Sequence, residues 1–187
     1  MRAWKHFKTI THHRMVVMKL CFRVGLIWQG LTHDLSKYSW TEFRVGARYC
    51  TGDHSPNVEE RKVLGYSTAW MHHKGRNKHH FEYWVDYRPG TRTYVPIEMP
   101  RRYLVEMCMD RIAACKTYHR DAYTDADALA YLDRSGEHHQ MNDTTHRQLR
   151  YLLVMLKEHG EKETFQFIRT VVLPGKPFAE PIAMPNE

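Results

Sequence analysis

The chain has 187 residues and a net charge of +7 with its histidines counted as neutral. This length predicts a single domain with a sizeable core, and no run approaches the roughly 18 apolar residues that span a membrane. The positive charge favours anionic partners, above all small phosphoesters and nucleotides. Nucleic acid is a weaker expectation, because the Lys and Arg residues are spread out and form no block.

The N-terminal residues 1–6 lack the long apolar segment and small-residue cleavage site of a signal peptide, so we expect a cytoplasmic protein. Four cysteines occur without a Cys-x-x-Cys pair. Cys21, Cys108 and Cys115 fall in apolar helical patterns and are predicted to be buried free thiols in a reducing compartment. Fourteen histidines are unusual for this length, and eight of them stand in adjacent pairs.

Residues 3–28 are predicted to form a helix, because apolar residues recur at three- and four-residue spacing through Val17, Leu20 and Val24. His13 lies on this apolar stripe, whereas His12 is expected to face water. A histidine in that position is either a core residue bonded to a carbonyl or a metal ligand. The ligand interpretation is favoured because a His-Asp pair follows twenty residues later.

That pair is His33-Asp34, which stands in a short predicted helix around residues 31–37. The imidazole and the carboxylate can bind one cation together, and the carboxylate can bridge to a second. Lys37 follows three residues after Asp34, near enough to meet an anion held by the metal.

Helix boundaries are well marked in the next segment. Ser39 and Glu42 form a predicted capping box that opens a helix ending at Tyr49. A loop over 51–57 precedes a helix that Ser55 and Pro56 are expected to begin. This helix is predicted from about 57 to 74, with Val63, Leu64, Ser67, Trp70 and Met71 pointing inward. His54, in the loop, is expected to be exposed and is kept as a reserve ligand.

Four histidines fall within nine residues around Gly75, in the run from His72 to His80. A basic, solvated loop would be the structural explanation. In the functional interpretation, His73 and His80 point inward as metal ligands, and His79 lies on the other side and binds substrate. This choice assumes that helical geometry continues up to the turn.

Residues 87–96 are predicted to form a loop or small hairpin, and Pro100 is expected to open a long helix that ends near Tyr118. Asp110 stands alone among inward-facing apolar residues of that helix. This aspartate is explained either by an ion pair, with Arg111 or with a neighbouring helix, or by a bound metal ion. Both explanations follow from the need of a buried carboxylate for a cation. Glu106, one turn earlier, is expected to be an outer-sphere partner or exposed.

The C-terminal third predicts a short helix to about Arg134, a helix from Asn142 to His159 that Gly160 ends, and a last helix over 163–172. His138 and His139 are expected to be solvated. The prediction is therefore an all-α fold, with one helical domain over 1–172 and a Pro-rich tail over 173–187 that is extended or poorly ordered.

The order His, His-Asp, His, His, Asp on successive helices resembles the HD-domain metal-dependent phosphohydrolase superfamily. His33-Asp34-x-x-Lys37 looks like its signature, and the stretch from Trp70 to Trp84 is similar to an uncharacterised bacterial and phage branch. The resemblance covers roughly residues 3–118 and implies a bundle of helices around a metal site.

The resemblance implies that one metal ion is bound by four residues together: His13, His33, Asp34 and Asp110. His73 and His80 would complete a second site, with Asp34 bridging. These two histidines are closer in sequence than the extra histidines of binuclear members usually are. Either both serve one metal across the turn, or one binds substrate and His54 takes the missing position.

The predicted function is hydrolysis of a nucleotide or another small phosphoester by a metal-activated water. Asp34 and Lys37 are the expected catalytic residues. Substrate would be bound by Lys37, Lys74, Arg76 and His79. One or two divalent ions are expected, and the ligand types do not distinguish Mn, Fe, Co, Ni and Zn.

Two other classes stay open at the level of sequence. Imidazole and carboxylate ligands with open positions also suit iron, and some HD-fold members are di-iron oxygenases. A module that binds nucleotide or nucleic acid without turnover would equally explain the positive charge.

Overall fold

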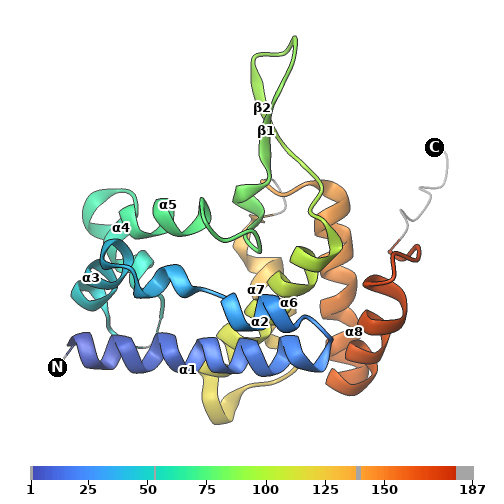
Figure 1. Cartoon of the computed structure of the whole chain (residues 1–187), viewed down its shortest axis with the longest axis horizontal. Coiled ribbons are helices and arrows are strands. Elements are labelled where there is room, and N and C mark those ends of the chain that lie inside the picture. Colours follow the sequence, from blue (N-terminus) through green and yellow to red (C-terminus); the bar gives the residue numbers. More distant parts are fainter. Residues whose placement is uncertain (1, 53, 138–139, 180–187) are drawn as a thin grey trace.

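The computed structural model describes residues 2–52, 54–137 and 140–179. Helices form almost all of its regular structure, which confirms the all-α prediction (Figure 1). The elements in chain order are α1 Arg2–Arg23, α2 Ile27–Thr32, η1 Leu35–Tyr38, α3 Trp40–Tyr49, α4 Pro56–Leu64, α5 Thr68–Lys74, η2 Phe81–Tyr83, β1 Val85–Arg88, β2 Thr93–Pro96, α6 Arg101–His119, η3 Arg120–Ala122, α7 Asp127–Ser135, α8 Asp143–Phe167 and η5 Ile168–Val172.

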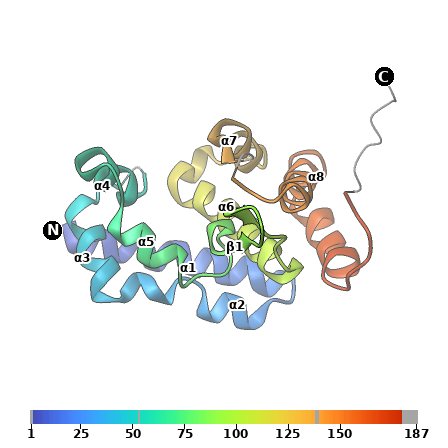
Figure 2. The same ribbon diagram turned by 90° about the horizontal axis from the view of Figure 1, so that it is seen from above.

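Helix α6 lies at the centre and contacts α1, α7 and α8 (Figure 2). A helix surrounded by others needs apolar side chains on most of its circumference. The middle of α6 meets this need, since six successive residues are buried: Leu104, Val105, Glu106, Met107, Cys108 and Met109. The one acid in that run, Glu106, therefore needs polar partners inside the protein.

The first predicted helix is shorter than expected. Helix α1 ends at Arg23, and α2 begins at Ile27 after a turn in which Gly25 has a φ of 86°. The Leu26 amide donates to the carbonyl of Cys21, which reverses the chain direction. Helix α2 consequently packs back along α1 and brings His33 and Asp34 beside the His13 face.

The prediction of one continuous helix over 57–74 is wrong, because this range contains two helices, α4 and α5. Gly65 ends α4 in the left-handed region, with φ of 81°, and the Ser67 side chain accepts from the Trp70 amide to begin α5. The predicted inward positions Val63, Leu64 and Met71 are exposed. The buried carboxylate of Glu60 holds the break by accepting hydrogen bonds, from Ser67 Oγ, Thr68 Oγ1 and the Ala69 amide.

The helix starts that depend on local capping are confirmed. Ser39 Oγ accepts from the Glu42 amide at the start of α3, Pro56 is the first residue of α4, and Asn142 Oδ1 accepts from two amides of α8. Helix α6 begins directly after Pro100, as expected. Each of these signals is contained in a few adjacent residues, so the sequence alone specifies it.

The predicted hairpin forms from β1 and β2, which pair antiparallel with Val85 opposite Pro96. Toward the C-terminus, Gly160 has non-helical backbone angles, with φ of 73° and ψ of 178°, so α8 consists of two helical segments that meet at a kink, in agreement with a predicted helix end at Gly160 and a further helix after it. The second segment ends at Phe167, and η5 continues to Val172. The described part of the predicted tail, residues 173–179, is held to the domain by the Phe178 ring, which contacts Tyr151 and Phe167. His138, His139 and residues 180–187 lie outside the described residues.

All four cysteines are buried and free of disulfides, as expected for Cys21, Cys108 and Cys115. None of the helices in the described part of the chain combines the length and apolar character needed to cross a bilayer. The cytoplasmic location stays a prediction.

Candidate metal centre

Five segments of the chain bring seven ligand-type side chains together. They come from α1, the α2–η1 junction, the end of α5, the turn after α5 and the middle of α6. The residues are His13, His33, Asp34, His73, His79, His80 and Asp110, and they form two groups that share Asp34. Within each group the ligand atoms lie within 4.8 Å of one another.

The backbone at Asp34 is unusual and explains how adjacent residues reach one site. His33 has an extended ψ of 127°, and Asp34 follows in the left-handed region with φ of 55° and ψ of 24°. Among residues other than glycine, Asp and Asn adopt this conformation most readily, at a modest cost in free energy. The bend allows both side chains to be almost completely buried in the same cluster.

The two oxygens of Asp34 face different groups. Oδ2 lies 3.4 Å from His33 Nε2 and 3.8 Å from His13 Nε2. Oδ1 lies 3.2 Å from His73 Nε2 and 3.4 Å from His79 Nε2. A carboxylate placed in this way can bridge two metal ions, one on each oxygen.

Asp110 completes the first group from α6. Its Oδ1 lies 2.9 Å from His13 Nε2 and 3.4 Å from His33 Nε2. The sequence left two explanations for this aspartate, and the structure places it with the histidines. The predicted set His13, His33, Asp34 and Asp110 is therefore brought together as one group.

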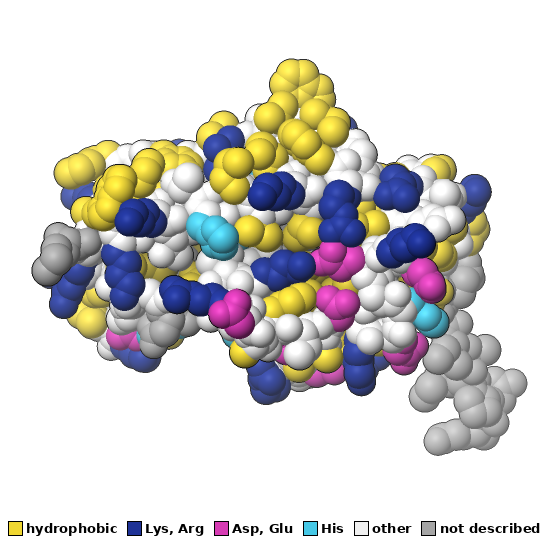
Figure 3. Space-filling view, turned by 90° about the horizontal axis from the view of Figure 1, so that it is seen from below, with side chains coloured by type: hydrophobic (Ala, Val, Ile, Leu, Met, Phe, Trp, Pro, Cys, Tyr) yellow, Lys and Arg dark blue, Asp and Glu magenta, His cyan; other side chains and the backbone are white. Residues whose placement is uncertain are grey.

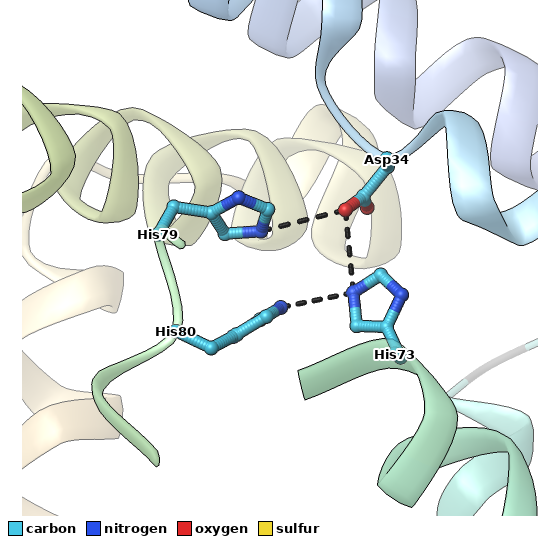
Figure 4. Close-up of side chains that lie close together, drawn as sticks. All are labelled: Asp34, His73, His79 and His80. Carbon is cyan, nitrogen blue, oxygen red and sulfur yellow. Dashed lines mark hydrogen bonds and ion pairs between the residues drawn. The ribbon is translucent and has the colours of Figure 1, made fainter. Parts of the chain in front are cut away.

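The second group contains one more histidine than predicted (Figure 4). His73 Nε2 faces His80 Nε2 at 2.9 Å, and His79 also points toward Asp34 (Figure 4). The predicted outward position of His79 is wrong, because α5 ends at Lys74 and residues 75–80 form a turn. Helical spacing does not apply in a turn, so both members of the pair reach the site.

Several buried atoms of the cluster have no hydrogen bond. They are His13 Nε2, His33 Nε2, His79 Nε2 and both carboxylate oxygens of Asp34. Asp34 Oδ2 and His13 Nε2 have charged neighbours at ion-pair distance, Lys37 and Asp110. A buried polar atom without a hydrogen bond nevertheless costs about 1–3 kcal/mol, so the convergence of these five atoms favours a shared partner. A cation between them would satisfy imidazole nitrogens and carboxylate oxygens together, and the residues present therefore fit divalent metal ions.

Two buried glutamates hold the outer faces of the histidine rings. Glu106 Oε1 accepts from Nδ1 of His33 at 3.0 Å and from Nδ1 of His79 at 3.1 Å. Glu42 accepts from His73 Nδ1 at 2.8 Å and from His72 Nδ1 at 2.6 Å. A proton fixed on Nδ1 leaves Nε2 with a free lone pair toward the centre, which is the arrangement that metal-binding histidines need.

Charge in the centre is dominated by Asp34. Burial opposes its ionisation, but His33 in its protonated form, the Lys37 ammonium and protonated His73 hold the pKa of its carboxyl well below its usual range. Asp34 in turn raises the pKa of His33 and of His73, so a metal ion would bind these two rings by displacing a proton. Lys37 Nζ lies 2.5 Å from Asp34 Oδ2, and that carboxylate raises the pKa of the ammonium against the effect of burial. Burial lowers the pKa of His13 and of His80, so both rings are neutral and able to bind a metal.

The structure does not gather all the predicted substrate residues. Lys37 belongs to the centre, and its side chain is partly exposed. Arg76 is exposed and donates to the carbonyl of His72, and Lys74 lies on the same segment outside both ligand groups. His54 pairs with Glu59 at 2.6 Å and is not part of either group.

A pocket adjoins the second ligand group. Lys37, Glu42 and His73 line it on the side of the centre. Opposite them are residues that the sequence did not single out, and they come from α1, α3 and α6: His6, Thr9, Ile10, Gly46 and Tyr118. Nothing in the local sequence marks these positions, because the pocket is formed only when the three helices pack.

Glu42 was expected only as a capping residue, and its role at the histidines was missed. The capping box is a sufficient reason for a Glu at that position, so nothing in the sequence indicates that its side chain also contacts the histidines. Glu106 was named as an outer-sphere candidate, and its spacing of four residues from Asp110 was the signal that identified it.

Comparison with known proteins gives one match. The sequence model of a family of unknown function (DUF5662) matches residues 2–155. No curated protein and no solved structure matches the chain. The match does not name the HD-domain superfamily, so that resemblance carries no more weight than the motif itself.

Proposed function

Because this chain belongs to the DUF5662 family, whose function is unknown, its activity must follow from its own side chains, and we propose that it is a metal-dependent phosphohydrolase. The observation that supports this most directly is the position of Asp34, whose two oxygens face two separate groups of histidines. The order of the ligands along the chain, which resembles that of HD-domain phosphohydrolases, agrees with it.

His13, His33 and Asp110 would hold one ion, His73, His79 and His80 the other, and Asp34 both. Divalent ions in such a site lower the pKa of water and neutralise the charge of phosphoryl oxygens. Imidazole and carboxylate ligands suit Mn, Fe, Co, Ni or Zn alike, so the metal is not specified by the ligands.

Lys37 would bind a phosphate oxygen of the substrate. Its ammonium is protonated at neutral pH, contacts Asp34, and is partly exposed toward the pocket. The pocket beside it would receive the group attached to the phosphate, and His6, Thr9 and Tyr118 offer polar contacts there. Lys74, at the end of α5, and Arg76, on the turn that follows, would add positive charge to the segment that carries His73 and His79.

The test is Asp34→Asn. This change removes the charge and retains both the side-chain size and the tolerance of the left-handed backbone. We expect loss of both metal equivalents and of phosphatase activity on nucleotide and small phosphoester substrates, by a factor of 10² or more. Asp133→Asn, at an exposed ion pair with Arg150, is the matched control and should retain both. Full activity in Asp34→Asn would refute the proposal.

An iron-dependent oxygenase is the second candidate, and one observation favours it. The second group holds three imidazoles with one carboxylate, a histidine-rich set that suits iron. Bound iron together with O₂ consumption would support oxidation. Turnover of phosphate substrates with Mn²⁺ or Co²⁺ would support hydrolysis.

A further inference from the structure

Most of the net positive charge of the chain comes from its N-terminal part, because basic and acidic residues nearly cancel in the rest. Residues 1–41 contain seven Lys and Arg residues and a single acid, Asp34, while the remaining residues hold 21 basic and 20 acidic side chains. Because Asp34 is buried in the metal centre, the outer surface of α1, α2, η1 and the start of α3 presents no carboxylate of its own. This surface is therefore suited to a polyanionic partner.

The same segment exposes three of the five tryptophans. Trp4 is 62% exposed, Trp28 74% and Trp40 75%. Tryptophan is seldom so accessible in a folded protein, and large exposed apolar areas commonly mark interaction sites. Figure 3 shows hydrophobic side chains gathered along one edge of this face of the molecule, with Lys and Arg side chains beside them.

Three of the exposed or half-buried aromatic side chains contact one another along the first turns of α1, and Trp28 and Trp40 lie on α2 and α3, which pack against α1. The Tyr38 hydroxyl lies 3.0 Å from Thr11 Oγ1, and the Tyr38 ring lies 6.0 Å from that of Phe7. Phe7 in turn stacks on Trp4 with ring centroids 5.6 Å apart, and Lys8 Nζ lies 5.2 Å from the Trp4 ring. We call Trp4, Phe7, Trp28, Tyr38 and Trp40 the aromatic strip.

One member of the strip, Tyr38, is adjacent in sequence to a residue of the metal centre. Tyr38 directly follows Lys37, whose ammonium contacts Asp34. Helix α1, which the strip follows, has 22 residues and is therefore about 33 Å long at 1.5 Å per residue. An extended ligand of several units could lie along it with one unit at Lys37.

We propose that the aromatic strip binds a single-stranded nucleic acid and that a phosphodiester of this strand is the substrate of the metal centre. Nucleic acid offers flat bases for the exposed rings and phosphates for the adjacent lysines, the combination used by sequence-tolerant single-strand binders. Hydrolysis would add one water across a P–O bond, leaving a phosphate on one fragment and a hydroxyl on the other. The substrate assignment depends on the proposed function, whereas the binding does not.

Binding is tested in EDTA, which separates it from metal chemistry. Fluorescence anisotropy of a labelled oligodeoxythymidine of about 15 nucleotides should show saturable binding. The logarithm of the association constant should fall linearly with the logarithm of salt concentration, because phosphate contacts release counterions. Saturable binding in EDTA without cleavage of the strand when Mn²⁺ is restored would contradict the proposed function alone, so that its failure and the failure of strand binding give different results.

Single substitutions on the strip supply the decisive comparison. Trp28→Ala and Trp40→Ala should each weaken binding about tenfold or more, as expected when a stacking platform is removed. Tyr94→Ala is the matched control, since Tyr94 is 76% exposed on the hairpin, outside the strip. Lys8→Gln should reduce the salt slope, and Lys157→Gln on α8 should not. Circular dichroism and thermal unfolding check that each variant is folded.

Three results would overturn the proposal. The first is absence of oligonucleotide binding by the wild type at low salt. The second is equal weakening by Tyr94→Ala and Trp40→Ala, which would indicate nonspecific attraction. The third is strip-dependent binding of anionic phosphatidylserine vesicles, or strip-dependent self-association, without strip-dependent binding of the oligonucleotide.

Discussion

Glu106 connects the two ligand groups through a single carboxylate oxygen. That oxygen accepts from His33 in the first group and from His79 in the second. Burial opposes the charge on Glu106, but the hydrogen bonds from both rings lower the pKa of its carboxyl, so that it is ionised at neutral pH. Glu42 contacts only the second group, through His73.

This difference gives a paired prediction. Outer-sphere carboxylates typically contribute 10- to 100-fold to metal affinity. Glu106→Gln should therefore weaken both metal equivalents, whereas Glu42→Gln should weaken one and leave the other near its wild-type affinity. Isothermal titration with Mn²⁺ or Zn²⁺ into the apo protein measures the two equivalents separately. Identical titration curves for the two variants would contradict the assignment of Glu106 to both groups.

His6 provides a prediction about pH. Burial, followed by the charge of Lys37, lowers the pKa of His6 from 6.5 to about 4. The unfolded chain then takes up a proton first as the pH falls, so the contribution of His6 to the free energy of unfolding is intact above pH 6.5 and is lost progressively toward pH 4. The full shift corresponds to about 3 kcal/mol.

Urea unfolding between pH 7 and pH 4 checks this prediction. His6→Gln should lose less stability over that interval than the wild type does, because it lacks the titrating ring. Parallel curves for the two proteins would show that His6 does not titrate as the structure implies.

At the scale of elements, α1 and α3 are in close contact where His6 meets Gly46. A Cβ built on Gly46 would lie 2.1 Å from His6 Nε2, so only glycine fits while the ring keeps its position. Both residues line the pocket beside the metal centre. The contact between the two helices therefore also sets the width of that pocket.

Gly46→Ala should destabilise the protein by about 1–2 kcal/mol, since overpacking costs about 1–3 kcal/mol and the better helix propensity of alanine returns less than about 1 kcal/mol. Gly75→Ala is the matched control: its φ is −74°, and the nearest atom to an added Cβ lies at 3.5 Å. It should be neutral or slightly stabilising. Thermal unfolding of both variants measures this difference. Equal free energies of unfolding for Gly46→Ala and Gly75→Ala would contradict the tight contact between His6 and Gly46.

Whether an element was predicted correctly depends on how far apart in the sequence the residues that specify it lie. Ser39 with Glu42, Ser55 with Pro56, and Asn142 act within one turn, and their helix starts were predicted correctly. The break between α4 and α5 was missed. It depends on Glu60, whose buried carboxylate binds residues seven to nine positions later, and periodicity does not register such a contact.

At the scale of the whole molecule, the sequence predicted the ligands of the centre where they lie on regular helices and failed for one ligand that lies in a turn. His13 and Asp110 lie on regular helices, where an apolar stripe indicates the buried face, and their positions were identified from the sequence. His79 lies in a turn, where no period exists, and its direction was predicted wrongly. The residues of the adjoining pocket come from separate helices, and only packing brings them together.

The account requires that the seven side chains bind metal, and elemental analysis of the protein as purified tests this requirement most directly. We predict up to two equivalents of a divalent transition metal in the wild type, bound on purification or filled when metal is added, and none in Asp34→Asn. Wild-type protein that stays metal-free when challenged with Mn²⁺, Fe²⁺, Co²⁺, Ni²⁺ and Zn²⁺ would contradict it, because the buried atoms of His13, His33, Asp34 and His79 that lack hydrogen bonds would then be held only by ion-pair contacts within the cluster.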